Sequence, residues 1–362
     1  MTIVKPAGAF VALSLGIASL FAACGGSSVA PAASTSPARA PAASANPAQA
    51  PASGQPAGQG PARIVASYSN ILADNLPTWI TKEAGIFEKH GLDVDLRLIE
   101  SSTGVPALIS GETQFSQLGG SEALSAAVGG ADIVVLATLT PVYPFVFEVP
   151  ASITSPAGLV GKKVGVSRIG SSSDIATRVG LRKVGLDPDK DVTFIQVGSA
   201  ATRVTAMKSG AIQGGLAEPP ETLSLEAQGF HPLFDMAKQD LPAVNFSVVA
   251  MRPYVSSHRD ITQRYIDAIM EGIAREKADK AFSIQVLQKY FKSNDEQGMG
   301  VTWDYFAKEV TPAQPLPKAD AFADAKAVLA KEAPKVANFD VQKILDATFV
   351  ESAVNRGVGA GS

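Results

Sequence analysis

The chain has 362 residues, with 31 Lys and Arg against 34 Asp and Glu, and a formal net charge of −3 at pH 7. Hydrophobic residues make up 46% of it and charged residues only 18%, so it can bury substantial cores. This mildly acidic balance excludes the strongly basic surface on which nucleic-acid binding depends.

The first residues, MTIVKPAGAFVALSLGIASLFAAC, are typical of an export signal. Lys5 precedes an apolar stretch that ends in small residues. The stretch is too short and too weakly flanked to indicate a permanent membrane span. We therefore predict a signal peptide over residues 1–23.

Cys24, the single cysteine of the chain, closes this segment. The letters LFAAC resemble the lipobox of bacterial lipoproteins, whose cysteine is lipidated and becomes the first residue, although Phe21 departs from the commoner Leu or Val. Lipidation of Cys24, for example by palmitate, places the protein on the extracytoplasmic face of the cell membrane. The alternative is an ordinary signal peptide that happens to contain a cysteine.

The segment after the cysteine has almost no capacity to fold. Residues 25–62 carry one charge, Arg39, and consist almost entirely of Ala, Pro, Ser, Gly and Gln. Such a composition cannot bury a core. We predict that residues 24–62 are the lipidated cysteine and a disordered Ala/Pro/Ser tether.

The remaining chain contains one unit twice. ALISGETQF (107–115) matches AMKSGAIQG (206–214), and RIVASYSN (63–70) matches KKVGVSRI (162–169), both at a spacing of 99 residues. Each copy reads as strand, helix, strand, helix, strand. This alternation indicates an α/β fold of two lobes with parallel sheets and a cleft between them.

Helical patterns extend this reading along the chain. LPTWITKEAGIFEKHG (76–91) and SSSDIATRVGLRKVG (171–185) each have apolar residues at helical spacing and a terminal glycine, and the second begins with a serine N-cap. Residues 255–291 and the chain to about 350 also read as helices, which we expect to return to the first lobe.

These patterns set the expected domain boundaries. Lobe 1 takes residues 63–149 plus 247–350, lobe 2 takes residues 150–246, and residues 351–362 form a flexible tail.

Four segments carry a family resemblance over residues 63 to about 350. They are LPTWITKEAGIFEKHGLDVDL, ALISGETQFSQLGGSEALSAAVGGADIVVLA, LVGKKVGVSRIGSSSD and AMKSGAIQGGLAEPP. In this order they resemble the nitrate/sulfonate/taurine-type substrate-binding proteins of ABC importers, whose fold thiamine-pyrimidine synthases share. The resemblance implies a two-lobed clamshell of the periplasmic-binding-protein type II, with ligand in the interlobe cleft and delivery of a small solute to ABC transporter permease subunits. It leaves the solute open, because the family spans anions and vitamins.

The stretch VGVSRIGSSSD (164–174) decides between catalysis and binding. No lysine follows Gly170 as a P-loop requires, and GSSSD lacks the second glycine of a nucleophile elbow. The three histidines and the single cysteine show no metal-site spacing, and the iron-dependent relatives use cysteine clusters. We therefore expect a binding protein with no cofactor, and keep an exported enzyme of the pyrimidine-synthase-like fold as the alternative class.

Ligands of open α/β sheets lie beyond the carboxyl ends of the strands, where helix N-termini offer donors and glycines permit close approach. This rule selects the candidate contacts Ser69, Asn70, Asn75, Trp79, Ser102, Thr103, Gly120, Ser121, Tyr143, Arg168, Ser171, Ser172, Ser173 and Glu218. The competing interpretations are that the serines only cap a helix, that Trp79 belongs to the core, and that Arg168 is a surface cation.

This set is rich in hydroxyls, amides and rings and poor in cations, and Glu218 opposes an anion. It favours a flat, neutral N-heterocycle held by stacking and edge hydrogen bonds. Among the ligand types of the resembled family, this points to vitamin uptake, with riboflavin first and a thiamine pyrimidine precursor second. The alternative is a small anion: an aliphatic sulfonate, taurine, nitrate or an aromatic carboxylate.

Overall fold

The computed structural model describes residues 60–239 and 241–360. The predicted signal peptide, the lipidation site Cys24 and residues 25–59 of the predicted tether lie outside this range. Within the described residues, no helix combines the length and the apolar character that crossing a bilayer requires.

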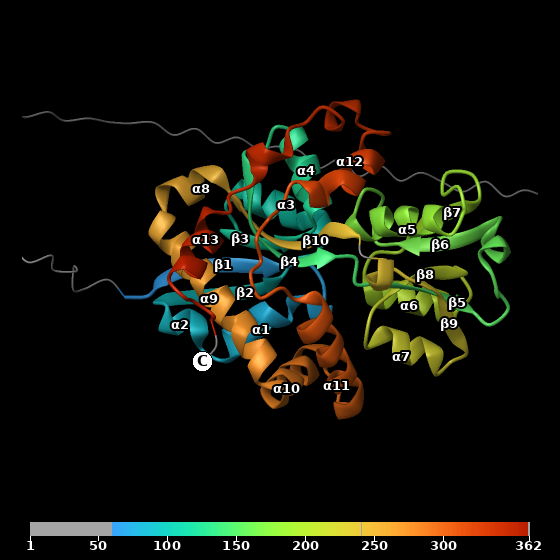
Figure 1. The fold of residues 1–362 in the computed structure, drawn as a ribbon, viewed down its shortest axis with the longest axis horizontal. Helices are drawn as coiled ribbons and strands as arrows, with labels where there is room; N and C mark the ends of the chain where they lie inside the picture. Colours follow the sequence, from blue (N-terminus) through green and yellow to red (C-terminus); the bar gives the residue numbers. More distant parts are fainter. Residues whose placement is uncertain (1–59, 240, 361–362) are drawn as a thin grey trace, which may run out of the picture. The chain divides into compact units, whose positions relative to one another are not determined.

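Two five-stranded sheets form the framework (Figure 1), and both lie within one compact unit of the chain. The first sheet has the order β2-β1-β3-β10-β4 and the second the order β7-β6-β8-β5-β9. The strands of the first are β1 (Ala62–Tyr68), β2 (Leu92–Leu98), β3 (Phe115–Leu118), β4 (Ile133–Val142) and β10 (Pro242–Met251). Those of the second are β5 (Val146–Pro150), β6 (Lys162–Val166), β7 (Val192–Gln196), β8 (Gly214–Ala217) and β9 (Phe230–Asp235).

The two sheets repeat one topology, which confirms the α/β fold class. Val65 of β1 pairs with Asp95 of β2, and Val164 of β6 pairs in the same parallel register with Phe194 of β7. The sheets are nevertheless mixed, because β10 runs antiparallel to β3 and β4, and β5 runs antiparallel to β8 and β9. The expected parallel pairs are present within each repeat, and each sheet also receives one antiparallel strand from outside its own repeat.

The helices follow the strands in the order that the repeat predicts. They are α1 (Leu76–Glu83), α2 (Ile86–Lys89), α3 (Ser101–Ser110), α4 (Gly120–Val128), α5 (Ser172–Lys183), α6 (Ala200–Lys208), α7 (Glu221–Glu226), α8 (Arg252–Ser257), α9 (Arg259–Ala278), α10 (Lys280–Phe291), α11 (Glu296–Tyr305), α12 (Ala323–Leu329) and α13 (Thr348–Asn355). Short 3-10 turns include η1 (Ala73–Asn75) and η2 (Pro156–Leu159), and a π-helical turn, Phe306–Val310, continues α11.

We call the first sheet with α1–α4, α8–α11 and α13 the first lobe, and the second sheet with α5–α7 the second lobe. The crossings between them lie earlier than the sequence suggested. All of β5, from Val146, pairs within the second sheet, and β10 joins the first sheet from Pro242. The chain therefore crosses between the lobes before β5 and before β10, a few residues ahead of the expected boundaries after residues 149 and 246.

The helix expected over residues 76–91 is interrupted. Gly85 adopts φ +66°, a left-handed conformation that favours glycine, so α1 ends at Glu83 and α2 starts anew at Ile86. Its counterpart α5 runs unbroken, and Ser171 caps it as predicted by accepting a hydrogen bond from Asp174 N.

The C-terminal segment is folded rather than a flexible tail through residue 360. Phe349 and Val350 of α13 are buried in the core of the first lobe, and a Cβ added at Gly359 would lie 2.8 Å from Met270 O. The last two residues, 361–362, lie outside the described range. The helical part of the chain from residue 255 to about 350 was expected to pack on the first lobe. One of its helices, α12, packs on both lobes, because it contacts α4 of the first and α5 of the second.

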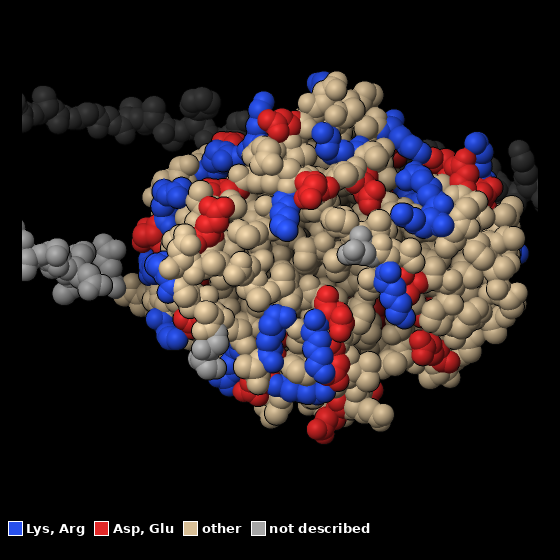
Figure 2. Space-filling view, viewed as in Figure 1, with Lys and Arg blue, Asp and Glu red and all other residues tan. Residues whose placement is uncertain are grey.

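Charged side chains of both signs are interspersed over the face shown in Figure 2, with no continuous field of one sign on that face.

Candidate ligand-binding site

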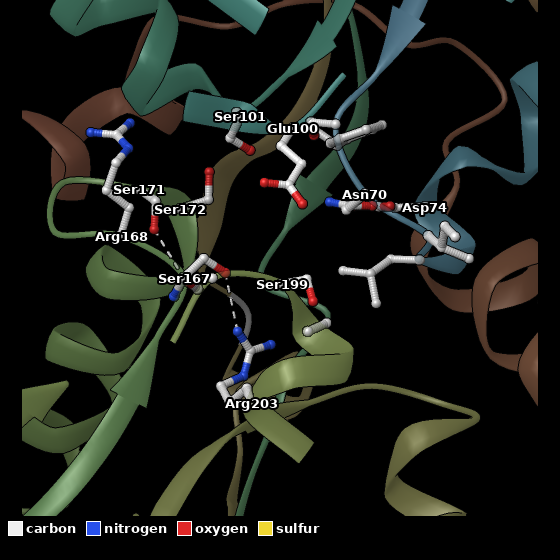
Figure 3. A pocket seen from close by; sticks show the side chains of 18 of the residues that line it. Asn70, Asp74, Glu100, Ser101, Ser167, Arg168, Ser171, Ser172, Ser199 and Arg203 are labelled. Carbon is white, nitrogen blue, oxygen red and sulfur yellow. Dashed lines mark hydrogen bonds between the residues drawn. The ribbon is translucent and has the colours of Figure 1, made fainter. Parts of the chain in front are cut away.

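A cavity of about 380 Å³ lies between the two lobes, at the lower end of the range typical of ligand pockets, roughly 300–1,000 Å³. Both lobes contribute to its walls (Figure 3). It is lined by Ser69, Asn70, Ile71, Leu72, Asp74, Leu98, Glu100, Ser101, Ser102, Gly119, Glu122, Phe145, Ser167, Arg168, Ser171, Ser172, Ser173, Gly198, Ser199, Ala200, Ala201, Arg203, Asn245 and Phe246.

Four helices begin at this cavity. The N-caps of α3, α4, α5 and α6 are Glu100, Gly119, Ser171 and Ser199, and all four residues line it. Helix N-termini expose unpaired N–H groups and the positive end of the helix dipole. Two such ends from each lobe make the cavity favourable for a negatively charged group.

Arg203 on α6 is the buried cation of the cavity, with a relative exposure of 2%. Its Nε donates to Leu216 O at 2.6 Å and its Nη1 donates to Ser167 Oγ at 3.2 Å. The side chain lies across β8, where a Cβ added at Gly215 would come 3.0 Å from its Cδ. The glycine therefore leaves room for the guanidinium to reach the cavity.

No carboxylate among the described residues pairs with Arg203 within 4.0 Å. Burial lowers its pKa, and the nearby carboxyls of Glu221 and Glu218 act in the opposite direction. A guanidinium that is buried and only partly hydrogen-bonded is well suited to bind an anionic ligand group.

The two walls differ in charge. Asp74, Glu100 and Glu122 line the cavity from the first lobe, whereas Arg168 and Arg203 line it from the second. Figure 3 shows Glu100 projecting into the cavity opposite Arg203. Burial, followed by the charge of Glu221, raises the pKa of Asp74 to about 8, so this carboxyl is largely uncharged at neutral pH.

The three consecutive serines have different roles. Ser171 caps α5. The Ser173 hydroxyl accepts from Ser167 N at 3.0 Å and lies 3.0 Å from Ser171 Oγ. Ser172 reaches the first lobe, where its Oγ donates to Glu122 Oε2 and to Asn245 O, both at 3.4 Å. The stretch thus combines a helix cap, an internal support and a contact between the lobes.

Seven of the residues selected from the sequence line the cavity: Ser69, Asn70, Ser102, Arg168, Ser171, Ser172 and Ser173. Seven do not: Asn75, Trp79, Thr103, Gly120, Ser121, Tyr143 and Glu218.

The two rings expected to stack on a ligand lie in the core instead. Trp79 is fully buried and stacks on Tyr290 of α10, with ring centroids 4.3 Å apart and planes at 9°. Tyr143 is 4% exposed and donates to Asp324 Oδ2 of α12 at 3.4 Å. Neither ring is among the residues that line the cavity, because α10 covers Trp79 and α12 covers Tyr143.

Four other candidate residues that do not line the cavity support the residues that form its wall. Asn75 Nδ2 donates back to Asn70 Oδ1 at 2.9 Å, and Thr103 Oγ1 donates to Glu100 O at 3.1 Å. A Cβ added at Gly120 would lie 2.5 Å from Val244, so this glycine packs against β10. Ser121 Oγ donates to Glu122 Oε2 at 2.7 Å.

Glu218 lies behind the wall and is 1% exposed. Burial, then the charge of Asp74, raises its pKa well above the ordinary value. It therefore does not present the negative charge to the cavity that its position in the sequence suggested.

Sequence reasoning left several lining residues out of the candidate contacts, above all Asp74, Glu100, Glu122 and Ser199, whereas Arg203 had been considered only as a candidate cation beside Arg168. The internal repeat could have indicated Ser199. It lies 99 residues after Glu100, and both residues are helix N-caps at the cavity. Asp74 had no such signal.

Residues 73–279, more than half of the chain, match the family model described as NMT1/THI5 like. The chain belongs to this family. A Brucella abortus protein, whose name describes it as a candidate binding protein, is 28% identical over 254 residues, covering 61% of this chain and 73% of that protein.

Solved structures share the fold. A Bordetella bronchiseptica protein superposes with a TM-score of 0.69 at 23% identity, covering 82% of this chain and 98% of that one. The alkanesulfonate-binding protein of Xanthomonas axonopodis bound to MOPS gives 0.62 at 18% identity, with 82% and 99% covered. The periplasmic nitrate-binding protein of Synechocystis gives 0.65 at 15% identity, with 82% and 89% covered. These likenesses establish the fold of periplasmic binding proteins for this chain.

Proposed function

We propose that this protein is the extracytoplasmic solute-binding component of an ABC importer, which captures a small organic solute between its lobes and delivers it to the permease subunits. Family membership, the shared fold and a cavity lined by both lobes support this function. Neither histidine nor cysteine is among the described residues that line the cavity, which favours capture over turnover.

The ligand is a small organic anion. The observation that carries this assignment is Arg203, which is buried at the cavity without an ion pair to any described residue and is accompanied by the N-termini of four helices. A sulfonate or carboxylate offers several acceptors to the guanidinium and the helix N–H groups at once.

The body of the ligand is apolar. Leu72, Phe145 and Phe246 line the cavity as buried side chains, and Ile71 and Leu98 line it at 40% and 46% relative exposure. Apolar surface of this extent favours an alkyl or aryl group behind the charged head, and disfavours an ion as small as nitrate.

Riboflavin, or a thiamine pyrimidine precursor, is the second candidate. Trp79 and Tyr143, the rings that motivated this assignment, do not reach the cavity. Phe145 and Phe246 do line the cavity, and their rings could contact a flat heterocycle.

Attachment to the membrane through a lipid on Cys24 completes the proposed function. A lone cysteine after an apolar segment that ends in small residues supports it. The Ala/Pro/Ser segment that follows lets the binding lobes reach the permease.

Calorimetry and thermal melting with butanesulfonate, benzoate, taurine, nitrate and riboflavin test the function and the ligand class together. We expect saturable binding of an organic sulfonate or carboxylate, and stabilisation by about 2.7 kcal/mol at 100 times the Kd. The affinity should fall as ionic strength rises from about 50 to about 500 mM.

If riboflavin fluorescence is quenched, and neither salt nor the anions have an effect, the ligand is a flat heterocycle and not an organic acid. The proposed transport function would be unaffected by this result. Chemical conversion of a bound compound, seen by mass spectrometry, would overturn the binding function itself.

A further inference from the structure

The segment between Pro315 and Asp346 leaves the first lobe, reaches the second lobe and returns. Both of its ends are bound to β4 of the first lobe: Thr138 N donates to Pro315 O at 2.8 Å, and Asp346 N donates to Val135 O at 3.0 Å. Between these ends, α12 contacts α5 of the second lobe, and Figure 1 shows it beside that helix. We call residues 315–346 the strap.

An apolar contact joins the strap to the loop in front of α5. A Cβ added at Gly170 would lie 3.3 Å from Cδ2 of Leu329, the last residue of α12. Leu329 and Ile175 of α5 are 8% and 1% exposed and belong to one hydrophobic cluster. The three serines that follow Gly170 line the cavity. The strap therefore packs against a loop that leads directly into the cavity wall.

A polar network runs from the strap to the same loop. Lys331 Nζ donates to Oδ2 of Asp189, which lies in the turn after α5. Arg178 Nη1 donates to Asp189 Oδ1 at 2.6 Å, and its Nε donates to Asp174 Oδ1 at 2.8 Å. Asp174 Oδ2 in turn accepts from Gly170 N at 2.9 Å. Direct hydrogen bonds thus connect the strap to the backbone that precedes the serines.

Burial increases along this network from the strap towards the loop. The side chains of Lys331 and Asp189 are 50% and 43% exposed, whereas those of Arg178 and Asp174 are 12% and 1% exposed. The hydrogen bond from Lys331 lowers the pKa of Asp189, so Asp189 is charged at neutral pH and attracts both cations. Arg178 also lies over the ring of Phe194, with its Cζ 4.2 Å from the ring centroid. The buried pair is therefore fixed within the second lobe, and the exposed pair attaches the strap to it.

We propose that the strap positions the ligand-binding N-terminus of α5 through Lys331, Asp189, Arg178 and Asp174, so that ligand affinity depends on residues outside the cavity. None of the four is among the described residues that line it. Because both ends of the strap are bound to β4, its contacts with α5 hold the second lobe against the first, and the fraction of binding-competent protein sets the apparent affinity. The inference rests on the proposed function, since it concerns the same site.

Amide hydrogen exchange without ligand tests the positioning role. Lys331→Met removes the charge and keeps most of the length of the side chain, and Asp189→Asn weakens both contacts of this carboxylate. We expect the amides of residues 170–176 to exchange about two- to fivefold faster in both variants, and those of β2 to exchange as in the parent. Lys335→Met changes another exposed lysine of the strap and should exchange like the parent throughout.

Calorimetry with the anion that binds best to the parent measures the consequence for affinity. Kd should rise about two- to fivefold for Lys331→Met, as expected for the loss of an exposed ion pair. Asp189→Asn should raise Kd further, because it affects the contacts with both Lys331 and Arg178. Lys331→Arg keeps the cation and should restore the Kd of the parent, and Lys335→Met should leave Kd unchanged.

Unchanged exchange of residues 170–176 in both Lys331→Met and Asp189→Asn overturns the positioning role. Faster exchange there with the Kd of the parent overturns the link to affinity, as does an equal rise in Kd for Lys331→Met and Lys335→Met. If the parent binds none of the compounds tested, the proposed ligand class is wrong, and the exchange measurement still decides whether the strap positions α5.

Discussion

The hydroxyl of Ser172 lies 3.4 Å from Oε2 of Glu122 and thereby joins the first turn of α5 to the first turn of α4, one helix from each lobe. Gly119 makes the approach possible, because a Cβ at this position would lie 2.0 Å from Ser172 Oγ and 2.3 Å from Glu122 Oε2. The contact between the lobes on this side of the cavity therefore requires glycine at position 119.

Gly119→Ala should hold the lobes apart at this contact. We expect a loss of ligand affinity of about tenfold, or about 1.4 kcal/mol, with a smaller change in melting temperature. Calorimetry with the best-binding anion measures it. Gly300→Ala is the control, since its new Cβ would meet only Ile284 Cδ1 at an ordinary 3.7 Å. Equal affinities in the two variants would refute the role of this contact.

Arg203→Met should remove most of the affinity for an organic anion. A hydrogen bond to a charged group contributes about 1.5–3 kcal/mol, so Kd should rise by one to two orders of magnitude and lose its dependence on salt. Arg168→Met, at an exposed position on the same wall, should change Kd much less. A stronger effect of Arg168→Met than of Arg203→Met in calorimetry would move the anion site to the rim.

Trp79→Ala should reduce stability rather than binding. The ring is fully buried and stacks on Tyr290, and truncation of such a residue costs about 3–5 kcal/mol. Ile71→Ala should do the reverse, because Ile71 lines the cavity and is 40% exposed. Urea denaturation and calorimetry on both variants separate the two effects. A Trp79→Ala protein with normal stability but without ligand affinity would show that the Trp79 ring contacts the ligand.

Glu276→Gln should flatten the dependence of stability on pH. This carboxyl is fully buried within α9 and accepts from Thr311 Oγ1 at 3.1 Å, and burial raises its pKa to about 8. The folded state therefore binds a proton that the unfolded state has released, and the parent loses stability as pH rises from the ordinary value towards 8. Urea midpoints at several pH values measure this, and parallel curves for parent and variant would exclude a titrating Glu276.

Cys24→Ser should abolish membrane retention without changing the folded lobes. A lipid chain contributes about 0.8 kcal/mol per buried CH₂, and serine offers no thiol to carry it. Fractionation of cells and the mass of the purified protein provide the measurement. A variant that remains in the membrane fraction with unchanged mass would exclude Cys24 as the anchor.

Local patterns in the sequence were sufficient for the two-lobed fold. The spacing of 99 residues between matching segments reflects a real repeat of the β1–β2 register in β6–β7. The crossing strands β5 and β10 had no such signal, because their partners lie in the other repeat.

The site was harder to predict for the same reason. Serines at the start of α5 follow from local capping rules, and all three line the cavity. The position of Trp79 is decided by Tyr290, more than 200 residues later. The importance of Arg203 depends on the carbonyl of Leu216 and on the space left by Gly215, which no pattern around residue 203 contains.

The exchange of β5 and β10 between the sheets has a consequence for biogenesis. A chain that emerges N-terminus first presents β3 and β4 long before Pro242–Met251, the strand that belongs between them. Until then both strands have open edges, which are templates for wrong pairing. The second sheet, by contrast, has all its strands by Asp235. The lobe that begins first is therefore finished last, and the first sheet keeps two unpaired strand edges until β10 has been made.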